Sequence, residues 1–167
     1  MTANTAIDLT EVTYRTLMPS DTATVRDLHA GLGERDRYYR FFGPRPKNLD
    51  HVATQIAAHD PKHFAVGAFL GRWLIGVANY VVLEDPRCAE VTMIVAHEDQ
   101  RSDIGTTLLA GLAQEARRYD IQRFVAEILS TNSTTMQLLM DADMPINAKC
   151  DNGVVSVVLE LGPAQRR

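Results

Sequence analysis

The segment from Asp99 to Thr106 is the part of the sequence best suited to hold a charged ligand. It reads Asp-Gln-Arg-Ser-Asp-Ile-Gly-Thr, follows a β-rich run and leads into a helical pattern that we expect to begin at Thr106. The start of a helix exposes unpaired backbone N–H groups and the positive end of the helix dipole, which together bind phosphate or pyrophosphate. Gly105 has no Cβ, so the backbone there can approach a ligand closely. Taken alone, the pattern is also that of an ordinary strand-to-helix turn that binds nothing.

The cysteines and histidines offer weaker chemistry. The two cysteines, Cys88 and Cys150, have no paired spacing, and no histidine is arranged to activate either, so we expect packed thiols rather than a nucleophile. His59 and His63 flank an Asp-Pro-Lys turn, and two histidines without a third ligand are weak evidence for a metal. We therefore expect no metal site.

The surrounding sequence predicts one α/β (α+β) domain. Apolar residues recur at helical spacing after Ser20, which can cap a helix that ends near Gly31, and after Asn48, which can cap a helix running towards Ala58. Further helices are expected at 37–42, 106–119 and 132–141, and strands at 12–17, 64–70, 73–83, 88–96, 123–129 and 154–161. This order predicts a mixed, mostly antiparallel central sheet flanked by helices. We expect residues 1–167 to form a single domain, with 1–11 as a loosely ordered N-terminal segment.

The composition argues against several classes of function. The chain has 167 residues, of which 46% are hydrophobic and 23% charged, as in an ordered soluble domain. Its net charge of −4 argues against nucleic-acid binding, which usually needs a basic face. No apolar run approaches the roughly 20 residues needed to cross a membrane, and the N-terminus lacks the pattern of a secretory signal. We therefore expect a cytoplasmic protein that has neither nucleic acid nor membrane as a partner.

The order of elements and one motif resemble the GNAT superfamily of N-acetyltransferases. The pyrophosphate loop of that superfamily reads Gln/Arg-x-x-Gly-x-Gly/Ala, and Gln100-x-x-Asp103-x-Gly105-Thr106 stands in its place here. Within the superfamily, the chain most resembles the Pat-type protein lysine acetyltransferases. This likeness rests on the block Tyr39-Arg40-Phe41-Phe42, on Ala89-Glu90-Val91, and on Asn132 followed by Met136.

The resemblance implies where acetyl-coenzyme A (acetyl-CoA) would lie as co-substrate. The strand that ends near Val95 would separate from its neighbour, and the backbone of Met93, Ile94 and Val95 would pair with the pantetheine arm. Backbone N–H groups near Val95 would polarise the thioester carbonyl. Asn132 would hydrogen-bond the pantetheine amides, although it is equally suited to cap the following helix. The residues implied for the pyrophosphate are Gln100, Arg101, Ser102, Asp103, Ile104, Gly105 and Thr106.

Glu90 is the general base that the resemblance implies. Pat-type enzymes have a glutamate in that role at this strand position, and a carboxylate can accept the proton that an amine nucleophile must lose. The alternative is a solvated carboxylate paired with Arg87 or Lys62. The predicted helix at 132–141 contains no tyrosine, the residue that many family members use to protonate the departing thiolate, so water would take this role.

Asp103 departs from the superfamily motif, which has its first glycine at this position. A carboxylate about 5 Å from a diphosphate charge would be repelled by roughly 3 kcal/mol at an effective dielectric constant near 20. Binding of the cofactor therefore depends on whether the side chain turns to solvent or is offset by Arg101.

The activity implied is acetyl transfer from acetyl-CoA to a primary amine. One candidate acceptor is a lysine of a metabolic enzyme, and a homodimer is one candidate assembly. The first alternative is a small-molecule amine as acceptor, and the second is a catalytically degenerate module that binds acyl-CoA or a partner. A negative groove around Glu90 would favour a lysine. The aromatic residues beside Arg40 either pack a helix onto the sheet or line the acceptor channel, where Arg40 would position an acidic partner or an active-site loop.

Overall fold

The computed structural model describes residues 8–43, 46–96 and 101–162, with the backbone alone for Arg101 and Ser102. The strands are β1 (Val12–Thr16), β2 (His63–Leu70), β3 (Trp73–Val82), β4 (Cys88–Val95), β5 (Arg123–Leu129), β6 (Ile146–Asp151) and β7 (Val154–Glu160). The helices are α1 (Thr22–Ala30), α2 (Glu34–Phe41), α3 (Leu49–Ile56), α4 (Arg101–Arg118) and α5 (Ser133–Asp141), with short 3₁₀ turns at Leu9–Glu11 and Pro19–Asp21.

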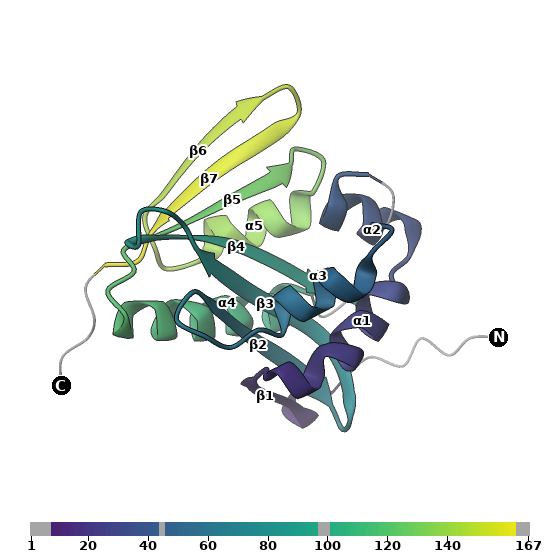
Figure 1. Cartoon of the computed structure of the whole chain (residues 1–167). Helices are drawn as coiled ribbons and strands as arrows, with labels where there is room; N and C mark the ends of the chain where they lie inside the picture. Colours follow the sequence, from purple (N-terminus) through teal and green to yellow (C-terminus); the bar gives the residue numbers. More distant parts are fainter. Residues whose placement is uncertain (1–7, 44–45, 97–100, 163–167) are drawn as a thin grey trace.

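The strands form one seven-stranded sheet in the order β1-β2-β3-β4-β5-β7-β6 (Figure 1). All neighbouring strands are antiparallel except β4 and β5, which are parallel. The predicted fold class, a mixed and mostly antiparallel sheet flanked by helices, is therefore confirmed.

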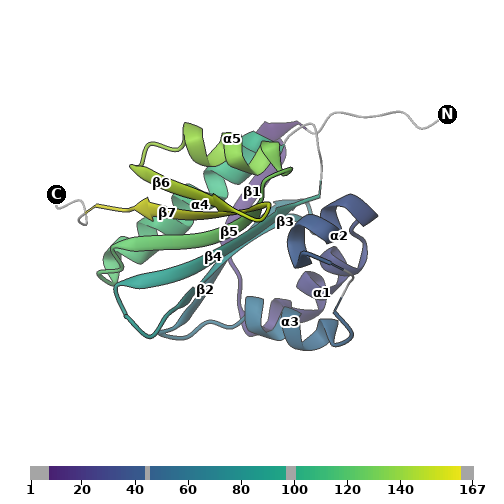
Figure 2. The ribbon, with the colours of Figure 1, turned by 90° about the horizontal axis from the view of Figure 1, so that it is seen from above.

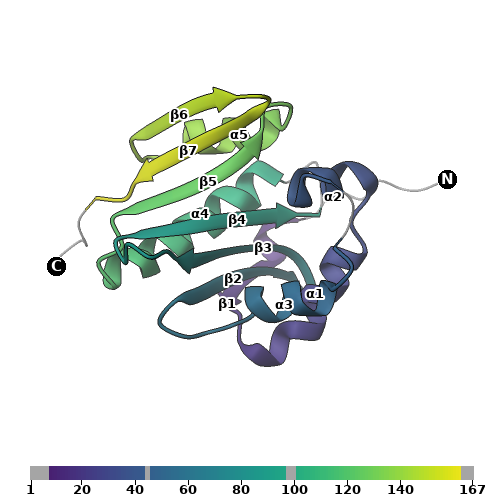
Figure 3. The same cartoon turned by 45° about the horizontal axis from the view of Figure 1, so that its top comes forward.

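The central pair of strands separates after a short contact. β4 and β5 pair only from Cys88 to Glu90 against Arg123 to Val125. Beyond that point β4 continues beside β3 as far as Val95, and β5 continues beside β7 as far as Leu129. A gap therefore opens in the middle of the sheet, and Figure 3 shows the two strands diverging towards α2.

Helices cover both faces of the sheet (Figure 2). α4 and α5 lie on one face, where Leu108, Leu112 and Phe124 belong to the larger buried cluster. α1 and α3 lie on the opposite face, where Val25 and Ile56 belong to a second cluster. α2 lies beside them and contacts β4. On β4, Val91 and Val95 belong to the larger cluster and Ile94 to the second, because successive residues of a strand point to opposite faces.

The structure corrects the start of one predicted helix and adds one strand that was not predicted. α4 begins at Arg101 rather than Thr106, because the helix runs straight through Gly105. β6 was not expected, because its sequence Ile-Asn-Ala-Lys-Cys-Asp lacks apolar alternation and most of the strand is exposed. A tight turn joins β6 to β7, with positive φ at Asn152 (52°) and Gly153 (79°), as primed hairpin turns require.

The predicted helix caps hold in two of three cases. Asn48 accepts a hydrogen bond from the backbone N–H of His51 at 3.1 Å, as an N-cap residue does. Asn132 likewise accepts one from the N–H of Thr135 at 3.3 Å. Ser20 was expected to cap α1 but lies inside the 3₁₀ turn that precedes it.

Within the described part of the chain, no helix is both long and apolar enough to cross a membrane.

Candidate active site

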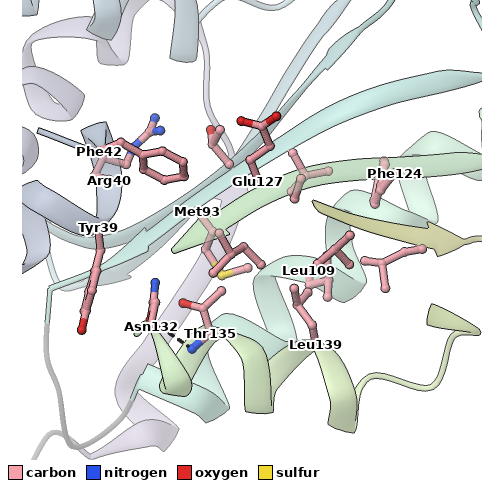
Figure 4. Close-up of a pocket in the computed structure, with 16 residues that line it drawn as sticks. Tyr39, Arg40, Phe42, Met93, Leu109, Phe124, Glu127, Asn132, Thr135 and Leu139 are labelled. Carbon is pink, nitrogen blue, oxygen red and sulfur yellow. Dashed lines mark hydrogen bonds between the residues drawn. The ribbon is translucent and has the colours of Figure 1, made fainter. Parts of the chain in front are cut away.

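A narrow cavity lies in the gap between β4 and β5. It measures about 80 Å³, and a second cavity of about 40 Å³ continues it along β4 towards Val95. Figure 4 shows its two ends: Leu109, Phe124 and Leu139 make one end apolar, and Tyr39 and Asn132 lie at the other. The gap is therefore lined, not filled, by side chains from both strands and from the helices on both faces.

The edge of β4 that faces the gap presents unpaired backbone groups. The N–H of Ala96 donates to the carbonyl of Ile75 on β3 at 2.9 Å, and the carbonyl of Cys88 accepts from the N–H of Leu83, directly after β3, at 2.9 Å. Because backbone groups alternate in direction along a strand, those of Ile94 also point to β3, and those of Met93 and Val95 point into the gap. No described strand pairs with β4 there after Glu90. Of the three residues predicted to pair with the pantetheine arm, Met93 and Val95 thus turn backbone groups into the gap and Ile94 does not; their role in cofactor binding stays a prediction.

The first turn of α4 lies at the same end of β4. A helix that begins at Arg101 leaves the N–H groups of its first turn, up to Asp103, without helical partners. Gly105 and Thr106 lie inside the helix, where backbone N–H groups donate to carbonyls of the preceding turn, and their role in holding the pyrophosphate stays a prediction. Gln100 lies outside the described residues, and Ile104 is a fully buried core residue.

Asp103 lies in this first turn with its side chain exposed to solvent. Its backbone carbonyl accepts a hydrogen bond from the hydroxyl of Thr107 at 3.1 Å. A carboxylate in the first turn also stabilises the helix through the dipole. The structure therefore gives Asp103 a favourable helical position at the place where the superfamily motif has glycine.

Two carboxylates share the face of the sheet that carries α2. Glu90 stands at the last paired position of β4, opposite Val125 of β5, and is exposed. Glu127 follows two residues later on β5, so its side chain points to the same face, and it lines the cavity. Figure 4 shows Glu127 across the upper part of the cavity from Arg40. Glu127 could not be singled out from the sequence, because only the divergence of the strands distinguishes it from other exposed strand carboxylates.

Thr92 follows Glu90 by two residues on β4, so it points to the same face, and it lines the cavity. Its hydroxyl donates to Oδ1 of the buried Asn79 at 2.5 Å. Since its proton is committed to Asn79, the Thr92 oxygen can only accept a further hydrogen bond from a ligand.

α2 closes the other side of the cavity. The hydroxyl of Tyr39 donates to the carbonyl of Thr131 at 3.1 Å, which ties α2 to the loop between β5 and α5. Arg40 and Phe42 also line the cavity, and the backbone of Phe42 ends α2 in the left-handed conformation, with φ of 58°. The Tyr39-to-Phe42 block thus contributes three side chains to the cavity wall, as the acceptor-channel interpretation requires.

The electrostatics of this wall centre on Arg40. Nε of Arg40 donates to Nε2 of His29 at 3.2 Å, and His29 is fully buried. Burial lowers the pKa of Arg40 to about 10, while the nearby charge of Glu90 acts in the opposite direction. Burial, and then the charge of Arg40, lower the pKa of His29 to about 4. At neutral pH the pair therefore consists of a cationic Arg40 and a neutral His29.

The remaining histidines and cysteines considered in the sequence lie away from the cavity. His63 pairs through Nδ1 with Asp60 at 2.8 Å, and the ring of His59 packs against Phe64. Cys88 is partly buried and Cys150 is exposed, so the expectation of a packed thiol fails for Cys150. Among the described residues, no three His, Cys, Asp or Glu side chains gather as a metal site would require.

Known structures share this fold. The GNAT domain of an S. lividans PAT superposes with a TM-score of 0.74 at 23% identity, covering 88% of this chain and 89% of that one. The Salmonella typhimurium protein yncA, solved with its cofactor acetyl-CoA, superposes with a TM-score of 0.68 at 17% identity, covering 91% of this chain and 95% of that one. Spermidine N-acetyltransferase from Vibrio cholerae, solved with CoA and spermine, superposes with a TM-score of 0.67 at 17% identity, covering 90% of this chain and 96% of that one. At these identities the likeness establishes the fold alone.

The sequence itself matches a family profile over most of its length. The profile of the Acetyltransferase (GNAT) family covers residues 32–140, which include α2, the separating strands β4 and β5, and α4. This span contains nearly every residue that lines the cavity. The chain therefore belongs to the GNAT family of acetyltransferases.

Proposed function

We propose that this protein transfers an acetyl group from acetyl-CoA to a primary amine (an EC 2.3.1 type of reaction). The observation that carries the proposal is the open edge of β4 beside the first turn of α4. Backbone N–H and C=O groups of β4 that pair with no described strand lie there beside the unpaired backbone N–H groups of the first turn of α4, and both border one cavity. An extended chain that ends in a diphosphate needs both.

The dimensions of the site suit such a chain. Cavities of about 80 and 40 Å³ are far below the roughly 300–1,000 Å³ of pockets that enclose a whole drug-sized ligand. A slender arm such as pantetheine would therefore lie extended along the open gap and would not be enclosed by it. The amides of that arm would pair with Met93 and Val95, and with the side chain of Asn132, which lines both cavities. The N–H groups of Arg101 to Asp103 would hold the diphosphate.

Acetyl-CoA supplies an acetyl group activated as a thioester. The residues of the chain would orient this group and accept the proton that the attacking amine loses. N–H groups on the free edge of β4 near Val95 would polarise the carbonyl that is attacked. Glu90 would take the proton that the amine loses, directly or through one water. α5 carries no tyrosine, so water would protonate the departing thiolate.

The acceptor would enter over the face of β5 and β7, next to α2, where Glu127 and Thr92 also lie. A lysine side chain of a protein is the acceptor that the Pat-type resemblance favours, and the S. lividans PAT domain supports this choice through its fold. A small amine is the second candidate, since spermidine N-acetyltransferase shares the fold. We further propose that the chain acts as one acetyltransferase domain.

Calorimetric binding of acetyl-CoA tests the cofactor site, and an acceptor screen then tests the reaction. We expect micromolar binding and transfer to at least one primary amine. Glu90→Gln should reduce kcat by about 10²–10⁴-fold, the contribution of a general base, while leaving acetyl-CoA binding unchanged. Glu127→Gln is the matched control. If it abolishes kcat and Glu90→Gln does not, then Glu127 is the base. If acetyl-CoA does not bind, the catalytic proposal fails and a degenerate GNAT module remains.

A further inference from the structure

Arg40 is held at the cavity wall by a single described hydrogen bond. Its Nε donates to Nε2 of His29, and the side chain is partly buried where both cavities meet. A guanidinium group has five N–H donors, so this bond uses only one of them. Among the described residues, neither terminal amino group of Arg40 has a hydrogen bond or an ion pair.

His29 fixes the direction of that bond. Its Nδ1 lies 2.9 Å from the carbonyl oxygen of Val25, which can only accept, so Nδ1 carries the proton. Nε2 is therefore the unprotonated acceptor that Arg40 needs. Because the pKa of His29 is lowered to about 4, this arrangement persists at neutral pH. His29 thus acts as a positioning residue that leaves the forked end of Arg40 available to the cavity.

A cation with unpaired donors in a partly buried site is costly, because burial removes its hydration. The charge of Glu90 acts on Arg40 without forming an ion pair with it, and the cost falls further when an anion binds the fork directly. Among side chains, the planar fork of arginine matches the two oxygens of a carboxylate best. Figure 4 places Arg40 on one side of the cavity and Glu127 on the other, so the acceptor side of the site carries a positive and a negative group facing each other.

We propose that Arg40 binds a carboxylate carried by the acceptor, so that the preferred acceptor is an amine with a neighbouring carboxylate. The inference rests on the proposed function. The ammonium group of such a molecule lies towards Glu127 and Glu90, while its carboxylate pairs with the fork of Arg40. A free amino acid and a lysine with an acidic neighbour in a peptide both present this chemistry.

The test compares amino acids with the amines that remain when their carboxylate is removed. The pairs are lysine with cadaverine, leucine with isoamylamine, and phenylalanine with phenethylamine. We expect wild type to favour the carboxylate member of at least one pair in kcat/KM. Arg40→Gln should lower that value about 10–100-fold through KM, the effect of losing hydrogen bonds to a charged group, and change the decarboxylated partner less than threefold. Arg40→Lys should retain part of the preference.

Arg37→Gln is the matched control, because it removes the same charge from the same helix and Arg37 lines neither cavity. Capped lysine peptides with a flanking Glu or Gln identify the source of the carboxylate. A preference confined to the Glu peptide indicates a protein acceptor, and one confined to free amino acids indicates a small molecule. Equal losses on both members of every pair, or no preference in wild type, would overturn the proposal.

A binding experiment separates this proposal from the proposed function. The same pairs are titrated calorimetrically into wild type and Arg40→Gln without acetyl-CoA. Binding of a carboxylate member that disappears in Arg40→Gln supports the anion site even if no acetyl transfer is detected. Binding that is indifferent to the carboxylate, or no binding of any pair, contradicts the anion site even if acetyl-CoA binds normally.

Discussion

Gly105 of α4 and Leu138 of α5 meet where there is no room for another carbon atom. A Cβ on Gly105 would overlap Cδ1 of Leu138 and would lie 3.2 Å from Sδ of Met93 on β4. The glycine therefore lets two helices and the free strand edge come together beside the cavity. Its role here is close packing, whereas the sequence suggested close approach of a ligand.

Replacing Gly105 with alanine should destabilise the protein by about 1–3 kcal/mol, the usual cost of overpacking, although alanine is the better helix former. Gly111→Ala on the same helix is the control. Its Cβ would lie 3.6 Å from Cγ2 of Val66, an ordinary contact, so it should be neutral or stabilising by up to about 1 kcal/mol. Urea unfolding measures both. Leu138→Ala should cost less in the Gly105→Ala background than in wild type, and equal costs would show that the two residues do not compete for space.

Asp103→Asn should tighten acetyl-CoA binding by about tenfold, because it removes a like charge from the helix start where we place the diphosphate. The same change should cost about 0.3–1 kcal/mol of stability, since the carboxylate favours the positive end of the helix. Calorimetry at low and high salt measures the first effect and urea unfolding the second.

Glu84→Gln removes an equal charge at the other end of β4, before Cys88, and should leave acetyl-CoA affinity unchanged. If both variants tighten binding alike, the gain reflects net charge. If Asp103→Asn has no effect, the diphosphate lies elsewhere.

The order of elements could be predicted because each depends on a local signal. The tight turn at Gly71, the cap at Asn48 and the apolar period of α4 are all properties of neighbouring residues. β6 escaped prediction, since an exposed edge strand needs no apolar face and is recognised only through its pairing with β7.

The residues of the site likewise fall into those that local sequence predicts and those that depend on contacts between distant segments. The turn before α4 was predicted as a phosphate site from one contiguous motif, and the role of the β4 edge was predicted from the resemblance to the superfamily. Glu127 and the His29–Arg40 pair were not, because their roles arise from contacts between distant segments. His29 followed the helical period of α1 and gave no sign that its second nitrogen faces Arg40, 11 residues later. Such a contact exists only once α1 and α2 are packed together.

Asn132 has two roles that different substitutions should separate. It caps α5 through its Oδ1 and also lines both cavities. Asn132→Ser retains a capping oxygen but removes the amide, so thermal stability should change little while acetyl-CoA affinity falls several-fold. Asn132→Ala should lose both, with a further cost of about 1 kcal/mol in stability. Equal affinity in wild type and Asn132→Ser would restrict this residue to its capping role.

His29 should make the stability of the protein depend on pH between about 4 and 6.5. The pKa of His29 is lowered from 6.5 to about 4 in the folded state, mainly by burial. Above pH 6.5 the ring is neutral in both states and its contribution is fully present. As the pH falls below 6.5, the unfolded state binds a proton that the folded state does not, so the free energy of unfolding decreases. The full loss is roughly 3 kcal/mol, reached near pH 4.

The measurement is urea unfolding at several pH values for wild type and His29→Gln. The glutamine cannot take up a proton, yet its carbonyl oxygen can still accept from Arg40. The difference in unfolding free energy between the two proteins isolates the histidine from the carboxylates that also titrate in acid. That difference should shift in favour of His29→Gln as the pH falls. A pH-independent difference for His29→Gln would mean that His29 is protonated as readily in the folded protein as in the unfolded chain, so that its Nε2 would stop accepting from Arg40 already below about pH 6.5.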